Sequence, residues 1–326
     1  MMTDSTLTQD LIQRFYFSGQ PFRGAVVQLQ NSFVEALNGH DYPQSVNYLL
    51  GEALSAATLM GINLKHNSRI SLQARGDASV TLLMAEATMM LDKVPDESAA
   101  TDHQATHSIR AVARVNADKP VEDNTRAEHA YLDLLGHGQL AITIEPEEGE
   151  RYQGIVSAEK HSLKLCLESY FNQSEQIPTC FQFAASSTGA AGILLQRMPH
   201  EDSYALDSRD RFTNDPQADE LWQELVALAD TLTDEELLSL PAQEILHRLF
   251  HQHPLQLAAA QSVGFKCSCS YERTAAALSH IDPLEIEDIL AEEGEIVMDC
   301  EFCSTRYRFD RDKIAQLQLR SSATRH

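Results

Sequence analysis

Apolar residues follow a helical period in one long stretch near the amino terminus and a two-residue period in the stretch after it. Residues 42–64, YPQSVNYLLGEALSAATLMGINL, place six apolar side chains on one helical face: Val46, Leu49, Leu50, Ala53, Leu54 and Ala57. Residues 68–91, SRISLQARGDASVTLLMAEATMML, instead predict two extended segments joined by a turn at Gly76 and Asp77. This part of the chain therefore mixes helices with strands.

Three further segments have the pattern of strands: residues 107–115, 138–146 and 151–157. The segment SLKLCLESYF at 162–171 is predicted to be helical again. Its apolar side chains are spaced i, i+3, i+4, i+7 and i+8: Leu163, Cys166, Leu167, Tyr170 and Phe171. Helices that interrupt strands in this way indicate an α+β domain over residues 1–196.

Residues 197–253 are predicted to form a helical and strongly acidic middle segment. Residues 201–240 contain 12 acidic side chains and two basic ones. Thr233 is a candidate helix N-cap with Glu236 at the position of a capping box, and Pro241 breaks or restarts the helix that follows. Because dense like charge opposes compaction, we expect this linker to be only marginally stable.

Residues 254–315 are predicted to form a small third unit, followed by a tail at 316–326. Ser270 can cap a short helix, and Asp282 can cap a second helix that Gly294 ends. Short strands, EIVMDC and RYRFD, follow that helix. A unit of this size is too small to hold itself together by its core alone, so we expect a cross-link within it.

Composition excludes several classes of function. Of the 326 residues 43% are hydrophobic, which is typical of a folded protein. The formal net charge of −23 means that nucleic-acid phosphates and anionic lipid surfaces repel the chain. The amino terminus lacks the basic and apolar regions of a secretory signal, and no stretch has the roughly 18 apolar residues of a membrane span. We therefore expect a cytoplasmic protein without nucleic-acid or membrane partners, in a compartment where thiols stay reduced.

Four of the six cysteines form two doublets in the third unit, Cys267 with Cys269 and Cys300 with Cys303. Two sequence-local thiol pairs are the usual way to build a tetrahedral zinc site of four thiolates, so we predict one zinc ion on these four residues. Zinc also keeps the sulfurs in the thiolate form that oxidants attack. Oxidation would destroy the site and, because the metal holds so small a unit together, would unfold it.

The spacing of the cysteines favours disulfides within each doublet, Cys267–Cys269 and Cys300–Cys303. Neither disulfide would replace the cross-link that zinc makes between the two doublets. We therefore expect oxidation to loosen this unit rather than lock it.

The remaining candidates for chemistry have structural explanations. Cys166 lies on the apolar face of a helix and Cys180 in an alternating, strand-like stretch, so both are predicted to be core residues. His247, His251 and His253 precede the first doublet, but four cysteines already complete a tetrahedron. The segment LLGHGQL around residues 136–138 lacks the lysine and hydroxyl of a phosphate loop and is predicted to be a turn between strands. No Ser/His/Asp arrangement has a supporting motif, and the chain is not expected to be an enzyme.

The cysteine segment resembles the zinc end of the heat-shock protein 33 family, the redox-regulated holdase chaperones. The resemblance extends over nearly the whole chain, and its most specific parts are the cysteine doublets and SEQIPT at 174–179. The segments that carry it are CSCSYER, CEFC and YRF at the third unit, LTDEELL and LHRLF in the middle segment, and FRG, DYP, LLGEAL, LKHNSRISLQARGD, LLGHGQLAITI, RYQGIV, SYFNQSEQIPT and AAGILLQRMP in the first region.

The resemblance implies a function. The reduced protein would be an inactive monomer with zinc on the four cysteines, and oxidants would form the disulfides Cys267–Cys269 and Cys300–Cys303 and release the zinc. The third unit and then the middle segment would lose structure. The protein would then dimerise and hold unfolding client proteins without ATP, until a reductant reverses the change.

The chain departs from the family pattern at Ala78 and Ala111, where glycine is expected, which leaves the local backbone geometry in question. Two other functions compete with the holdase. A four-cysteine zinc module could bind nucleic acid or protein, but the basic residues of the third unit are scattered among acids. A thiol–disulfide oxidoreductase could use Cys300 and Cys303, but this pair is predicted to lie between strands rather than at a helix N-terminus.

Overall fold

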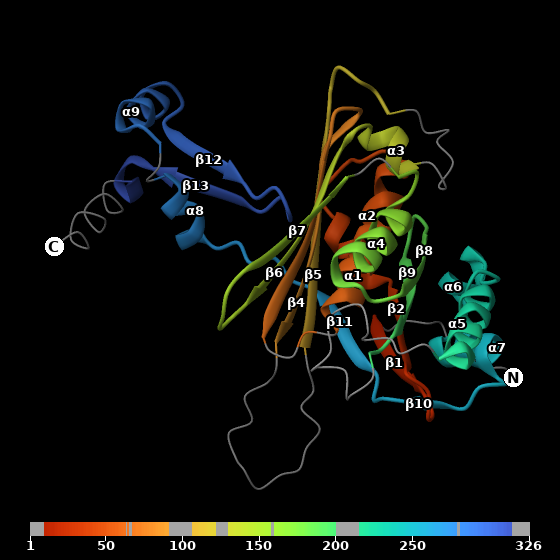
Figure 1. Ribbon diagram of the computed structural model, residues 1–326. Coiled ribbons are helices and arrows are strands. Elements are labelled where there is room, and N and C mark those ends of the chain that lie inside the picture. Colours follow the sequence, from red (N-terminus) through yellow and green to blue (C-terminus); the bar gives the residue numbers. More distant parts are fainter. Residues whose placement is uncertain are drawn as a thin grey trace, which may run out of the picture. The chain divides into compact units, whose positions relative to one another are not determined.

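The computed structural model describes residues 10–62, 64, 67–90, 106–121, 130–157, 160–199, 215–278 and 281–314. The described residues of 1–37 and 41–265 form one compact unit, and those of 38–40 and 266–326 form a second. The predicted α+β class is confirmed, because both helices and strands build the chain (Figure 1). The predicted tail at 316–326 and the first part of the acidic segment, 200–214, lie outside the described residues.

The first unit is built on one long, mainly antiparallel sheet. Its strand order is β7-β6-β3-β4-β5-β11-β1-β2-β9-β8, and β10 pairs with β1 outside this path. The strands are β1 (Leu11–Phe17), β2 (Phe22–Leu29), β3 (Ser68–Gly76), β4 (Val80–Met90), β5 (Thr106–Val115), β6 (Gly138–Pro146), β7 (Tyr152–Ser157), β8 (Thr179–Ala185), β9 (Ala190–Arg197), β10 (Leu255–Leu257) and β11 (Gln261–Phe265).

Strand β11 joins the two halves of this sheet. It pairs in parallel with β5, where Val263 lies opposite His107, and antiparallel with β1, where Ser262 lies opposite Leu11. The sequence placed residues 254–265 in the third unit, whereas β10 and β11 belong to the first. Backbone pairing explains the difference, because strand hydrogen bonds tie these residues to distant strands of the sheet.

Helix α2 (Gln44–Gly61) is the centre of the first core. The predicted apolar face of this helix is buried, but Ala56, Leu59 and Met60 outside that face are buried too. The helix contacts strands of both halves of the sheet, so it is covered almost all round. The other helices of the core region are α1 (Asn31–Leu37), α3 (Ala130–Leu135), α4 (Leu163–Tyr170) and a π-helical turn at Phe171–Glu175.

The middle segment covers the other face of β1, β2, β8 and β9 (Figure 1). It consists of α5 (Pro216–Ala229), α6 (Asp234–Ser239) and α7 (Ala242–Phe250). Neighbouring strand residues point to opposite faces, so Phe181 and Leu194 face α2 while Cys180 and Ile193 face the middle segment. This half of the sheet is therefore apolar on both faces, and only the docked helices keep one of those faces from water.

The predicted capping box of α6 is present. The hydroxyl of Thr233 accepts a hydrogen bond from the backbone N–H of Glu236 at 3.3 Å, and the carboxylate of Glu236 accepts one from the backbone N–H of Thr233 at 3.2 Å. Helix α6 ends before Pro241, as expected, and α7 begins after it.

Replacement of the cap, Thr233→Ala, is expected to destabilise the middle segment by about 1 kcal/mol, because the N–H groups of the first turn lose their acceptor. Amide hydrogen exchange measures the effect, with faster exchange confined to α6 and α7. Ser239→Ala on the same helix is the control, since that hydroxyl only donates back to the carbonyl of Glu235 at 2.6 Å. Equal exchange rates in the two variants would contradict the role of the cap.

The second unit contains α8 (Tyr271–Leu278), α9 (Pro283–Glu292) and a two-stranded sheet of β12 (Glu295–Asp299) and β13 (Arg306–Asp310). Asp282 caps α9 by accepting a hydrogen bond from the N–H of Leu284 at 2.8 Å, and Gly294 ends it with a φ of 80°. The described part of its core is small: Ala275, Leu278, Ile286, Leu290, Ile296, Phe309 and Ile314.

Two local predictions change in the structure. The turn at 136–138 connects helix α3 to strand β6 rather than two strands, and Gly136 has a φ of 68°. Ala78 and Ala111 need no glycine, because among the described non-glycine residues only Gln176 and Ser304 have positive φ.

Candidate metal centre

The four thiols of the second unit come together at one point. Cys267 and Cys269 lie in the loop between β11 and α8, and Cys300 and Cys303 lie in the turn between β12 and β13. All four Sγ atoms are within 4.8 Å of one another. Among the described residues this is the only cluster of three or more His, Cys, Asp or Glu side chains that could hold a metal ion.

The donor set fits a tetrahedral site. The Sγ atoms of Cys267 and Cys300 are 3.6 Å apart, and those of Cys269 and Cys303 are 3.4 Å apart. Four sulfurs about 2.3 Å from one ion would be separated by about 3.8 Å, close to both distances. Both of these distances cross between the doublets, so sulfurs from the two loops meet at one point. The four residues could therefore bind a metal ion.

Local hydrogen bonds hold each doublet in place. Ser270 caps α8 through its hydroxyl, which accepts from the N–H of Arg273 at 3.2 Å, and this fixes the loop of the first doublet. In the second doublet the N–H of Cys300 donates to the carbonyl of Thr305 at 2.9 Å, and the N–H of Ser304 donates to the carbonyl of Cys300 at 2.8 Å. The turn closes with Ser304 at a φ of 54°, a conformation that few non-glycine residues adopt.

Polar groups also reach the sulfurs directly. The hydroxyl of Tyr307 donates to the Sγ of Cys269 at 3.1 Å, and the hydroxyl of Thr305 lies 3.2 Å from the Sγ of Cys303. Such hydrogen bonds orient the sulfurs and stabilise them as thiolates.

The thiols differ in acidity when no metal holds them. Burial raises the pKa of Cys267 to about 12 and also raises the pKa of Cys300. Burial acts in the same direction on Cys303, but hydrogen bonds from Thr305, Cys269 and Cys267 together outweigh it and lower its pKa to about 7. Without a metal, the thiol of Cys303 therefore ionises more readily than those of Cys267 and Cys300.

The other sequence candidates lie elsewhere. Cys166 and Cys180 are buried, with 1% and 5% of their surface exposed, so both predictions of core positions are confirmed. Burial raises the pKa of Cys166, and it raises the pKa of Cys180 to about 12. His247 and His251 contact each other on α7, and His253 lies 3.2 Å from Glu224. None of the three histidines belongs to the cysteine cluster within the described chain.

Sequence reasoning missed the residues that hold the middle segment on the sheet. Phe15 and Phe22 of β1 and β2 are buried there, and the side-chain amide of Gln28 donates to the carbonyls of Leu237 at 3.2 Å and Leu240 at 2.7 Å. The signal was available, because GAVVQL and AAGILLQ are continuous apolar runs of the kind found in strands buried on both faces.

The fold and the site together define a class of protein: an α+β unit covered by a helical segment and followed by a small unit with four clustered thiols. The family model described as Hsp33 protein matches residues 10–310. The chain is 38% identical over 319 residues to the 33 kDa chaperonin of Shewanella oneidensis, an alignment that covers 98% of this chain and 99% of that protein. It is 39% identical over 311 residues to the 33 kDa chaperonin of Shewanella frigidimarina, covering 95% and 96%.

A solved structure has the same fold. The crystal structure of the 33 kDa chaperonin, a heat shock protein 33 homolog, from Thermotoga maritima matches with a TM-score of 0.74 at 21% identity, over 96% of this chain and 99% of that one. The chain belongs to the Hsp33 family. It is thus a chaperone of this family, and not an enzyme. Of the helices that the structure describes, none combines the length and the apolar character needed to cross a membrane.

Proposed function

We propose that this chaperone is an ATP-independent holdase whose activity is switched by oxidation of Cys267, Cys269, Cys300 and Cys303. The observation that carries the proposal is the meeting of four thiols within 4.8 Å in a unit whose described core consists of seven side chains. Such a core is too small to hold the unit without a cross-link, so the state of the sulfurs decides whether the unit is folded.

In the reduced protein the four cysteines hold one zinc ion. Zinc would supply a cross-link between the two doublets and would keep the sulfurs as thiolates. Tyr307 and Thr305 support the same state by donating hydrogen bonds to two of the sulfurs. Softer metals fit four thiolates as well, but zinc is the usual structural ion of four-cysteine sites.

Oxidation removes the ligands. An oxidant such as hypochlorous acid accepts two electrons from each pair of thiolates, a sulfur–sulfur bond forms, and the oxidant leaves as chloride and hydroxide. We assign the bonds to Cys267–Cys269 and Cys300–Cys303. Once these bonds form, the unit has no thiolates left to hold zinc, and its two halves are no longer cross-linked.

The middle segment is the second element of the switch. The chain leaves α7 at Phe250, passes through β10 and β11, and reaches the first ligand at Cys267, so unfolding of the second unit acts directly on the strand that precedes it. The middle segment carries a dense negative charge, and repulsion among its carboxylates weakens its docking on the sheet. Its release uncovers apolar side chains of the sheet such as Phe22 and Ile193, and apolar patches of this kind bind unfolded chains.

The same uncovered face accounts for the other properties that we propose. Exposed apolar surface favours a homodimer in the oxidised state and a monomer in the reduced state. The net charge of −23 keeps the opened protein dispersed. The reversible use of thiols places the protein in the cytoplasm, where reductants return it to the inactive form.

The experiment follows zinc release, free thiols and suppression of client aggregation together while the protein is oxidised at raised temperature. We expect loss of four thiols and one zinc ion to coincide with the onset of holdase activity. Protease should also cut within 197–253 much faster after oxidation. Zinc that stays bound while activity is unchanged would make the centre purely structural.

Peptide mapping of the oxidised protein tests the pairing. The sulfurs of Cys267 and Cys300 are 3.6 Å apart and those of Cys269 and Cys303 are 3.4 Å apart, so disulfides across the doublets are the alternative. Crossed disulfides would preserve the link between the halves of the unit. Finding them in the active form, with the unit still folded, would contradict activation by unfolding.

The competing functions receive little support. In the second unit Arg306, Arg311 and Lys313 form ion pairs with Asp299 at 2.8 Å, Glu287 at 2.6 Å and Asp310 at 3.4 Å, so these cations are not free for a phosphate backbone. Cys300 and Cys303 lie in a turn between strands, not at the N-terminus of a helix, where oxidoreductases place such a pair.

A further inference from the structure

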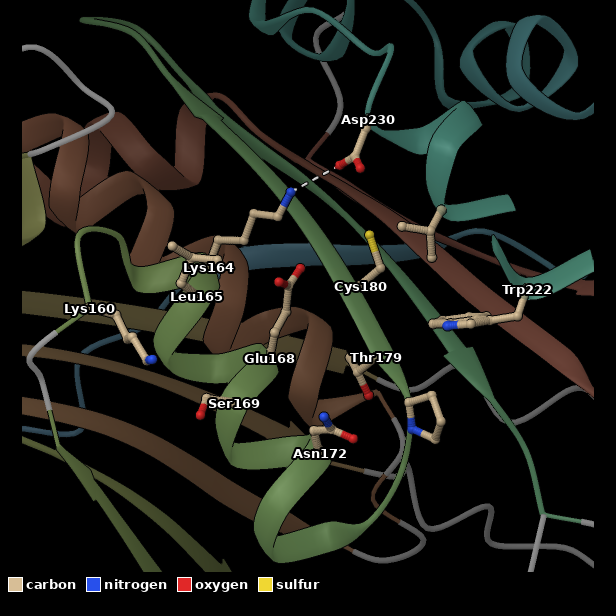
Figure 2. Close-up of a pocket in the computed structure, with 12 residues that line it drawn as sticks. Lys160, Lys164, Leu165, Glu168, Ser169, Asn172, Thr179, Cys180, Trp222 and Asp230 are labelled. Carbon is tan, nitrogen blue, oxygen red and sulfur yellow. Dashed lines mark hydrogen bonds and ion pairs between the residues drawn. The ribbon is translucent and has the colours of Figure 1, made fainter. Parts of the chain in front are cut away.

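A cavity of about 470 Å³ lies between the core and the middle segment of the first unit. Helix α4 and strand β8 supply one side of it, and α5 with the residue after it supplies the other (Figure 2). The residues that matter here are Lys160, Lys164, Glu168, Cys180, Trp222 and Asp230. The volume is within the range of small-molecule sites, about 300–1,000 Å³.

The charges in the cavity leave one cation uncompensated. Lys164 is paired with Asp230 at 3.1 Å, and the same carboxylate accepts from the side chain of Gln182 at 2.5 Å. Glu168 accepts a hydrogen bond from the backbone N–H of Phe181 at 2.9 Å, so part of its hydrogen-bonding capacity is already used within the protein. Lys160 is exposed and forms no ion pair with any residue that the structure describes. Lys160 is therefore the ammonium group that a ligand carboxylate can pair with.

The opposite end of the cavity is apolar. Figure 2 shows Lys160 and Trp222 at opposite sides, with Glu168 between them. Trp222 is half-buried and stacks on Phe22 with ring centroids 5.9 Å apart, so its indole is held in place. Val226 and Pro178 line the cavity as well. A fixed indole beside aliphatic groups suits a planar apolar ring.

We propose that this cavity binds a small aromatic monocarboxylate, with the carboxylate at Lys160 and Lys164 and the ring against Trp222. Binding itself is independent of the proposed redox switch. Its consequence rests on that switch. Trp222 and Val226 of α5, with Asp230 directly after that helix, complete the lining, so only the docked middle segment offers the whole site. A bound carboxylate therefore holds the middle segment closed and opposes activation.

Trp222 is the one tryptophan in the chain, so intrinsic fluorescence reports on this cavity directly. The probe is 3-phenylpropionate, which does not absorb where tryptophan is excited, titrated into the reduced, zinc-loaded full chain. A ligand of about eleven non-hydrogen atoms is expected to bind with a dissociation constant on the order of 1 mM. The matched probes are 3-phenylpropylamine and 3-phenylpropanol, which keep the ring and change only the charge.

We expect a saturable change of fluorescence with the carboxylate and binding at least about tenfold weaker with the amine and the alcohol, because a hydrogen bond to a charged group is lost. Equal affinity for all three probes, or no saturable change with the carboxylate, would overturn the proposal.

The variant Lys160→Gln tests the carboxylate contact without disturbing docking, since this side chain has no ion pair among the described residues. The dissociation constant is expected to rise about tenfold. Lys119→Gln is the matched control: its ammonium donates to the carbonyl of Asp77, neither residue lines the cavity, and the affinity should not change. An unchanged affinity in Lys160→Gln would refute the assigned orientation.

Proteolysis within 197–253 after oxidation tests the regulatory consequence. At a probe concentration ten times the dissociation constant, the opening equilibrium should fall about elevenfold, and cleavage should slow accordingly. Slower cleavage in the wild type but not in Lys160→Gln would support the clamp. If fluorescence reports binding but oxidation never accelerates cleavage, the proposed redox switch is wrong and the binding site is still supported. If oxidation accelerates cleavage and the probe does not slow it, the redox switch is supported and the stabilisation of the docked segment by the ligand is refuted.

Discussion

Replacing Cys300 with serine is expected to abolish tight zinc binding and to leave the second unit unfolded even in reductant. A structural zinc site contributes about 10–16 kcal/mol. If the four thiolates share this equally, losing one costs about 2.5–4 kcal/mol, or a roughly 70- to 900-fold loss of affinity. The small core built around Phe309 and Leu290 cannot offset that loss. Metal content after dialysis and amide hydrogen exchange across 266–314 measure the two effects.

Cys180→Ala is the control for this variant. It removes one thiol from the chain but leaves the cluster of four intact, since Cys180 is buried against the middle segment in the first unit. One bound zinc and a protected second unit are expected. Full zinc content in Cys300→Ser would mean that the ligand assignment is wrong.

The variant Phe250→Ala is expected to release the middle segment without any oxidant. Phe250 is 1% exposed, and its ring packs against Phe15 at 6.0 Å and Phe17 at 5.2 Å between ring centroids. Truncating a buried phenylalanine costs about 3–5 kcal/mol, which raises the population of the undocked form by about two orders of magnitude or more. The reduced, zinc-loaded variant should suppress client aggregation, and protease should cut within 197–253.

His251→Ala is the matched control, because this neighbour is exposed at the end of the same helix. It should behave as the wild type in both assays. If Phe250→Ala is cut quickly but shows no holdase activity, the sheet face under α7 is not what clients bind. If it is neither cut nor active, docking of α7 does not control the middle segment.

Features that depend on neighbouring residues could be predicted from the sequence. The caps at Thr233, Ser270 and Asp282 were placed correctly, because a cap needs only a side-chain oxygen and the next turn of backbone. The turn between β3 and β4 was also placed correctly, at Gly76 and Asp77. The four cysteines could be grouped in advance for a similar reason, since each doublet lies in a tight loop and a small unit has few other means of cross-linking.

Features that depend on pairing between distant residues were not predicted. Strand β11 was placed in the wrong unit, because five residues, QSVGF, carry no local sign of the strands they pair with. Helix α2 was predicted with one apolar face, but only the sheet that wraps it explains why Ala56 and Met60 are buried as well.

The sequence by itself determined the class of the protein, the acidic character of its middle segment and the four thiols that can hold a metal ion. These features depend on composition and on the spacing of residues close together in the sequence, neither of which requires knowledge of the tertiary structure. The tertiary structure alone decided that α5–α7 cover the second face of β1, β2, β8 and β9, and that Lys160 and Trp222 line one cavity. The physical reason is that burial on two faces, and the space left between packed elements, arise from contacts between residues tens to hundreds of positions apart.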